Sequence, residues 1–320
     1  MEGFLTAASS PHIRSSVNTK GTMRDVIIAL VPALAAGIYF FGIKALIVIV
    51  TSIASCVLSE YICNKIRKRK QSIGDYSAVV TGILLAFNLS PSINPVFVAI
   101  GGAFAIIIAK MLFGGLGHNF INPALAARAF MLASWPVQMT SWVNPVDAVS
   151  SATPLALIKK GSEVIGGQLP SYWSLFIGNI GGCIGETSTL ALLVGAAYLL
   201  YRRVITLYIP VSFIATVALF TWILGGDRLF TGDFVYHLLT GGLMLGAFFM
   251  ATDYTTSPVT TKGMIIMGMG CGLITSVIRL YGGYPEGVSY SILFMNVAAP
   301  LIDKYTKPRS FGGELHARNA

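Results

Sequence analysis

Long apolar runs alternate with short polar or glycine-rich segments along the whole chain. Several of the runs reach the ~17–20 residues that a helix needs to cross the hydrocarbon core of a bilayer. Glycine and proline interrupt them, whereas the strands of a membrane β-barrel would alternate apolar and polar residues. The pattern therefore predicts an all-α integral membrane protein with ten transmembrane helices. The expected helices lie at about 25–41, 45–63, 76–89, 96–112, 123–133, 188–201, 204–224, 234–250, 263–280 and 288–302.

The two halves of the chain repeat short blocks in the same order. The matched blocks are Gly74-Asp75 with Gly232-Asp233, Thr81-Gly82 with Thr240-Gly241, Phe87 with Phe248, and the segment from Lys110 with that from Arg279. Units of five spans insert in opposite directions, so the pattern predicts two inverted repeats, 25–133 and 188–302, with a site between them. The short third and eighth runs, which follow the Gly-Asp pairs, are candidates for broken helices.

Composition and charge fix the expected orientation. Of the 320 residues 54% are hydrophobic and 11% charged, against ~25% charged in soluble domains. The net charge of +9 gathers in short segments, above all 65–70 with five cations in six residues. Such clusters mark cytoplasmic loops beside anionic lipid, and nucleic-acid binding is not expected. We expect a single domain in the bacterial cytoplasmic membrane, with the arm 1–24 and the tail 303–320 cytoplasmic and the loop 134–187 outside.

Polar residues interrupt the apolar pattern most strongly at Asp147–Ala156, within the predicted external loop. Ser150, Ser151 and Thr153 lie here, and Pro154 restricts the backbone directly after the threonine hydroxyl. From the residues alone this is an ordinary Ser/Thr-rich loop or an accessible site for modification.

A second group of polar residues lies at the start of the fifth run. Asn119 and Asn122 are three residues apart, so their amides share one helical face and can bond a ring that carries donors and acceptors. Helix capping is the alternative role. Arg128 lies inside the run, at a cost of ~2.5–3.5 kcal/mol on insertion scales. It should face the bundle interior and pair with a carboxylate. Neither the cysteines nor the histidines show a metal-ligand spacing.

These motifs together resemble the NqrB/RnfD family of membrane flavoprotein subunits. The segment Ser150-Ser151-Ala152-Thr153 is similar to the S-G-A-T motif of that family, with Ser151 in place of glycine. Residues 113–128, Gly185-Glu186-Thr187-Ser188 and Met250–Asp253 also resemble family blocks, and the resemblance extends nearly end to end. With ten spans and no long amino-terminal extension, the chain resembles the RnfD branch, from the Rnf complex, more closely than NqrB.

The resemblance implies two flavins. FMN would be joined to Thr153 through a phosphoester bond, with Ser150 and Ser151 beside it and the backbone N–H groups at Glu186 and Thr187 near its negative charge. A second, non-covalent flavin, riboflavin or FMN, would lie near Asn119 and Asn122 on the cytoplasmic side, and Arg128 is a further residue expected to bind a cofactor. No catalytic residue and no metal ligand is expected in this chain.

The resemblance also implies a function and its partners. The chain would carry electrons in an Rnf-type complex that couples ferredoxin:NAD electron transfer to Na⁺ or H⁺ translocation. Its expected partners are an external flavin subunit, membrane iron–sulfur subunits, a cytoplasmic NAD-binding subunit, the flavin transferase and the bilayer. No G-x-G-x-x-G follows a strand, so NAD turnover by this chain alone is not expected. The alternative is an inverted-repeat channel or carrier for a small polar solute, without a redox cofactor.

Overall fold

The computed structural model describes residues 18–142, 153–159, 169–226, 228–284 and 286–308, and within these ranges every regular secondary-structure element is a helix. The all-α prediction is therefore confirmed for the described residues. The α-helices are α1 (Thr19–Ile66), α2 (Ser77–Phe87), α3 (Pro95–Ile106), α4 (Pro123–Ser134), α5 (Pro136–Met139), α6 (Pro154–Lys159), α7 (Tyr172–Ile177), α8 (Thr189–Tyr201), α9 (Tyr208–Leu224), α10 (Phe234–Leu239), α11 (Leu243–Leu245), α12 (Thr261–Tyr281) and α13 (Val288–Thr306). Short helical segments of other types are η1 (Ile73–Asp75), η2 (Ile107–Met111) and η3 (Gly246–Met250).

The first two predicted runs form a single element with one break. Asn18 begins α1, where its side chain accepts a hydrogen bond from the N–H of Gly21 at 2.6 Å. Gly42 leaves the helical conformation at φ 64° and ψ −147°, in a region that only glycine adopts readily. The turn expected at 42–44 is thus reduced to one residue, and helical structure continues on both sides of it.

The third and eighth predicted runs are short or interrupted helices. Before α2 the chain forms the 3₁₀ segment η1, and Tyr76 then takes a left-handed conformation at φ 65°. In the eighth run, Gly241 and Gly242 at φ 69° and 66° separate α10 from α11. Helix ends therefore lie inside both runs, where their polar backbone groups need partners.

In its described part, the predicted external loop, 134–187, contains three short helices that the sequence pattern did not reveal. Their lengths of four to six residues are too short to show a helical period. A proline at the first position of α5 and of α6 sets a helical φ, and Ser171 caps α7. Packing adds to these local signals, because Leu175 of α7 and Ile158 of α6 lie against Tyr236 of α10. The loop assignment is corrected accordingly.

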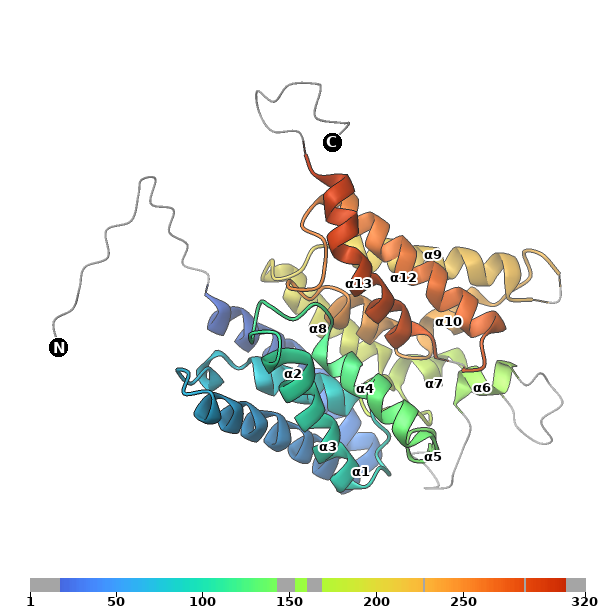
Figure 1. Ribbon diagram of the computed structural model, residues 1–320. Coiled ribbons are helices and arrows are strands. Elements are labelled where there is room, and N and C mark those ends of the chain that lie inside the picture. Colours follow the sequence, from blue (N-terminus) through green and yellow to red (C-terminus); the bar gives the residue numbers. More distant parts are fainter. Residues whose placement is uncertain (1–17, 143–152, 160–168, 227, 285, 309–320) are drawn as a thin grey trace, which may run out of the picture.

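The helices form two groups that meet along shared contacts (Figure 1). Helices α1, α2 and α3 pack together, α9 packs along α12, and α12 packs on α13. Contacts of α1 with α8 and of α4 with α13 join the groups. At the first junction a Cβ on Gly195 would lie 2.0 Å from the carbonyl oxygen of Ala29, so only glycine allows this approach.

Large apolar side chains cover the outer faces of the long helices. Val50 of α1 is 56% exposed, Val211 of α9 54% and Val277 of α12 46%. Soluble proteins rarely expose apolar surface on this scale. By length and composition, α1 and α12 could each cross a membrane, and α2, α3 with η2, α4, α8 and α9 are shorter apolar helices. The outer faces of the helices are therefore suited to contact with lipid.

Candidate functional site

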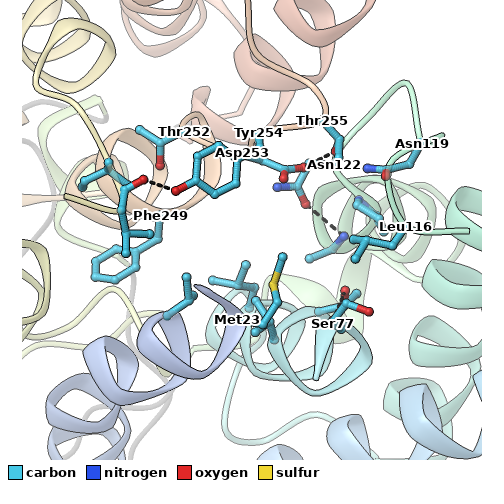
Figure 2. Close-up of a pocket in the computed structure, with 18 of the residues that line it drawn as sticks. Met23, Ser77, Leu116, Asn119, Asn122, Phe249, Thr252, Asp253, Tyr254 and Thr255 are labelled. Carbon is cyan, nitrogen blue, oxygen red and sulfur yellow. Dashed lines mark hydrogen bonds between the residues drawn. The ribbon is translucent and has the colours of Figure 1, made fainter. Parts of the chain in front are cut away.

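A cavity lies beside the start of α4. Its wall is mostly apolar, with a few polar side chains (Figure 2). We call it the amide cavity, after Asn119 and Asn122 in its wall. Its lining residues are Met23, Val26, Ser77, Val80, Thr81, Leu84, Lys110, Leu116, Asn119, Asn122, Pro123, Ala124, Leu199, Val204, Ile205, Phe248, Phe249, Thr252, Asp253, Tyr254 and Thr255.

Asn122 both caps a helix and faces the amide cavity. Its side-chain oxygen accepts from the N–H groups of Ala124 at 3.1 Å and Leu125 at 3.3 Å, the bonds of an N-cap. Its amide nitrogen donates to the carbonyl oxygen of Met250 at 3.3 Å, which ties α4 to η3. Asn119 donates to the carbonyl oxygen of Ile121 at 3.2 Å. The capping alternative is therefore correct for Asn122, and the structure also brings both amides to one cavity.

Asp253 is a polar residue of the amide cavity that the sequence pattern left without a role. It lies on the segment between η3 and α12, and its Oδ2 accepts from the hydroxyls of Thr255 at 3.0 Å and Thr256 at 3.3 Å. Burial raises the pKa of the Asp253 carboxyl, while hydrogen bonds from Thr255, Thr256 and Asn119 act in the opposite direction. The only sequence signal was its place in the Met250–Asp253 block.

Lys110 brings a buried cation to the wall of the same cavity. It lies in the π-helical segment η2, where one extra residue in the turn alters the direction of the side chains. Its ammonium donates to Glu60 Oε2 and to Ser77 Oγ, both at 2.6 Å, and the residue is 2% exposed. Phe248 and Phe249, in the second π-helical segment η3, line the cavity as well.

Arg128 lies at a different cavity from Asn119 and Asn122. It is six residues beyond Asn122, about 9 Å farther along α4 at 1.5 Å per residue. Its guanidinium pairs with Glu286 and donates to Asn88 Oδ1 and Ser289 Oγ, each at 2.8 Å. It does not line the amide cavity, so the structure does not bring it together with the two asparagines.

The second cavity encloses about 490 Å³ and contains several aromatic side chains. We call it the arginine cavity. Its lining residues are Arg128, Ala129, Leu132, Met139, Thr140, Trp142, Tyr284, Glu286, Ser289 and Tyr290. They come from α4, α5 and the region around the start of α13. Arg128 thus links the two halves of the chain beside this cavity.

Glu186 and Thr187 lie just before α8 and are buried at 8% and 1% exposure. Glu186 Oε1 accepts from the N–H of Cys183 at 3.0 Å. The Cys183 sulfur and one carboxylate oxygen each of Glu186 and Glu286 all lie within 4.8 Å of one another. Arg128 pairs with the Glu286 carboxylate of this group. The result is a compact buried cluster of charges between the helix groups.

Thr153 begins the short helix α6. Its Oγ1 accepts from the N–H of Ala156 at 3.3 Å, and its side chain is buried, with the residue 4% exposed. Ser150 and Ser151 lie outside the described residues. Phosphoryl attachment therefore requires the atoms that cover the Thr153 hydroxyl to move aside.

Arg279 stabilises the break between α10 and α11, which lies beside α6. It donates to the carbonyl oxygens of His237 at 2.5 Å, Thr240 at 3.0 Å and Gly241 at 3.2 Å, at the end of α10. A Cβ on Gly241 would lie 2.2 Å from Leu155 of α6 and 2.8 Å from the Arg279 guanidinium. Glycine therefore allows α6, the α10 end and Arg279 to come together.

Comparison with known proteins gives matches along nearly the whole chain. The family described as "NQR2, RnfD, RnfE family" matches residues 6–312. The chain is 54% identical over 313 residues to the D subunit of the Na⁺-translocating ferredoxin:NAD⁺ oxidoreductase complex of Acetobacterium woodii, covering 96% of this chain and 95% of that one. It is 49% identical over 321 residues to the D subunit of the proton-translocating ferredoxin:NAD⁺ oxidoreductase complex of Clostridium ljungdahlii, with 97% of each chain covered. The D subunit of the ion-translocating oxidoreductase complex of Cronobacter sakazakii is 37% identical, with 95% and 98% covered.

Proposed function

This chain belongs to the NQR2, RnfD, RnfE family, and from that premise we propose that it carries electrons as the D subunit of an Rnf-type complex. In this role it works in the cytoplasmic membrane with ten spans in two inverted repeats. The complex couples electron transfer between ferredoxin and NAD to the movement of Na⁺ or H⁺. The observation that carries the proposal is the end-to-end match to relatives named as the D subunit of ion-translocating oxidoreductase complexes, two of them ferredoxin:NAD⁺ oxidoreductases.

We place the covalent FMN of this proposal on Thr153. Bound flavin supplies the redox chemistry, and the protein supplies position and electrostatics. Support comes from the S-S-A-T-P segment and from the place of Thr153 at the first turn of a short helix. The aromatic side chains of the arginine cavity, Trp142, Tyr284 and Tyr290, could hold an isoalloxazine ring, and Trp142 is eleven residues before Thr153.

We place the second, non-covalent flavin in the amide cavity. Its apolar wall with a few polar groups suits a small aromatic ligand. The Asn119 and Asn122 amides and the Asp253 carboxyl supply hydrogen-bonding groups for the polar edge of the ring. The aromatic side chains Phe248 and Phe249 supply apolar contact. Electrons then pass between the two flavins across the membrane, and the cytoplasmic and external partner subunits exchange them at either end.

The test of the covalent flavin is the intact mass of the full-length protein. Protein made in cells with the flavin transferase is expected to carry the added mass of one FMN, less one water. The same chain from cells without the transferase should have the mass of the bare polypeptide. A channel or carrier would give the bare mass in both cases, and that result would contradict the electron-carrier proposal.

Asn122→Ala is expected to release the non-covalent flavin. The variant loses an amide of the cavity wall together with an N-cap worth about 0.5–2 kcal/mol. Asn94→Ala is the matched control, because Asn94 also caps a helix that begins with proline, accepting from Val96 N–H at 2.9 Å, and does not line the cavity.

The measurement is flavin released from the purified, denatured full-length proteins and counted per chain. Asn122→Ala should retain little and Asn94→Ala as much as wild type, with similar losses of stability. Equal flavin content in the two variants would argue against the amide cavity as the site.

A further inference from the structure

Lys110 and Glu60 form an oriented charge pair behind the wall of the amide cavity. The Lys110 ammonium and the Glu60 carboxylate are 2.6 Å apart, with side chains 3% and 0% exposed. Lys110 is a lining residue of the cavity and Glu60 is not. The positive end of the pair therefore faces the cavity, and the negative end lies behind it.

The surrounding hydrogen bonds fix this orientation. Ser77, also in the cavity wall, accepts from the ammonium at 2.6 Å and donates to Asp75 Oδ1 at 2.6 Å. Ser72 donates to the other carboxylate oxygen of Glu60, and Asn64 donates to Ser72 at 2.9 Å. The carboxylate is thus held on the side away from the cavity, and the ammonium cannot rotate out to water.

We infer that Lys110 sets the reduction potential of the flavin in the amide cavity, by keeping a positive charge against its ring. The inference rests on the proposed function, because it needs a flavin at this site. Two electrons from a donor and one proton from water convert the neutral ring into a reduced ring with one negative charge. A nearby cation stabilises that product more than the oxidised ring, and the effect is large where little water screens it. Asp253 lies in another part of the wall from Ser77, the hydrogen-bond partner of Lys110 (Figure 2). A negative charge on Asp253 acts on the reduced ring with the opposite sign to Lys110.

Glu60 serves as a positioning residue that partly cancels the field of Lys110. Removing the charge of Glu60 and removing the charge of Lys110 should therefore shift the reduction potential of the flavin in opposite directions. Glu60→Gln keeps the shape and leaves the cation uncompensated, so the potential should rise. The double variant Glu60→Gln with Lys110→Met removes the cation without stranding a buried carboxylate, so the potential should fall below that of Glu60→Gln and of wild type.

The experiment uses full-length protein made without the flavin transferase and loaded with riboflavin, so that only the non-covalent flavin is present. Its midpoint potential is measured by spectroelectrochemical titration. We expect at least a tenfold change in the relative affinity for reduced and oxidised flavin between the two variants, which is about 30 mV for a two-electron couple. Lys262→Met, which removes an exposed lysine outside the cavity, is the control and should leave the potential unchanged.

The outcomes separate the two proposals. If wild-type protein binds no riboflavin, the site itself is wrong, and the inference falls with it before any potential is measured. If wild type and variants bind riboflavin with the same potential, only the role of Lys110 is overturned. If the midpoint potential shifts in the same direction in Glu60→Gln and in the double variant, a packing effect is responsible, and the role of Lys110 is likewise overturned. Glu60→Gln is nearly isosteric, so it tests the inference even if the double variant does not fold.

Discussion

Thr153→Val is expected to remove all covalently bound flavin from the protein. Valine has nearly the shape of threonine but no hydroxyl to form the phosphoester. It also loses the hydrogen bond from Ala156 N–H to Thr153 Oγ1, at a cost of about 0.5–2 kcal/mol as for other N-caps. The fold should survive this loss. The measurement is flavin fluorescence of the denatured protein on a gel, together with its intact mass.

Thr231→Val is the matched control for this prediction. The Thr231 hydroxyl accepts from the N–H of Arg228 at 3.3 Å, the same distance as for Thr153, and the residue lines neither cavity. The control should keep the fluorescent band, and Thr153→Ser, which restores a hydroxyl, should recover part of it. A bright Thr153→Val band would place the attachment at another residue.

Arg128→Met should be the most destabilising of these substitutions. The change leaves the carboxylate of Glu286 buried without its partner, beside Glu186. Breaking a buried ion pair from one side costs about 3–5 kcal/mol. Replacing both partners, as in Arg128→Met with Glu286→Met, should recover much of the loss, because no unpaired charge remains. The free energy of unfolding is measured in detergent micelles by denaturant titration.

Arg202→Met provides the comparison at the surface. Arg202 pairs with Asp25 at 3.1 Å, but its side chain is 48% exposed. Exposed ion pairs contribute about 0–1 kcal/mol, so this variant should remain close to wild type. If the two arginine variants lose the same stability, the buried pair does not hold the two helix groups together in the way the geometry indicates.

The positions of the long helices could be predicted because the bilayer imposes one simple pattern on the sequence. The predicted runs 123–133 and 234–250 coincide closely with α4 and with the segment from α10 to η3. The proline after Asn122 and the asparagine cap also mark the start of α4 correctly. Local signals of this kind need no knowledge of the tertiary structure.

The parts that could not be predicted depend on contacts between distant residues. Glu286 lies 158 residues from Arg128 in the sequence, in a short connection without a periodic pattern. Glu60 and Lys110 pair across 50 residues, and Lys110 looked like one cation within an apolar run. Helix α6 is too short for periodicity to reveal, and packing against α7 and α10 stabilises it. The sequence pattern therefore singled out the asparagines, Thr153 and Arg128, but not the carboxylates that pair with the buried cations.

The contacts of Arg279 have a consequence for the order in which the protein assembles. The carbonyl groups at the end of α10 receive their bonds from a side chain about forty positions later in synthesis. Backbone groups without partners are costly in lipid. Before α12 is synthesised, these carbonyl groups lack their Arg279 donor, so α10 cannot take its final position in the bilayer. We therefore expect the segment from α10 to η3 to enter the bilayer together with α12, as one late unit.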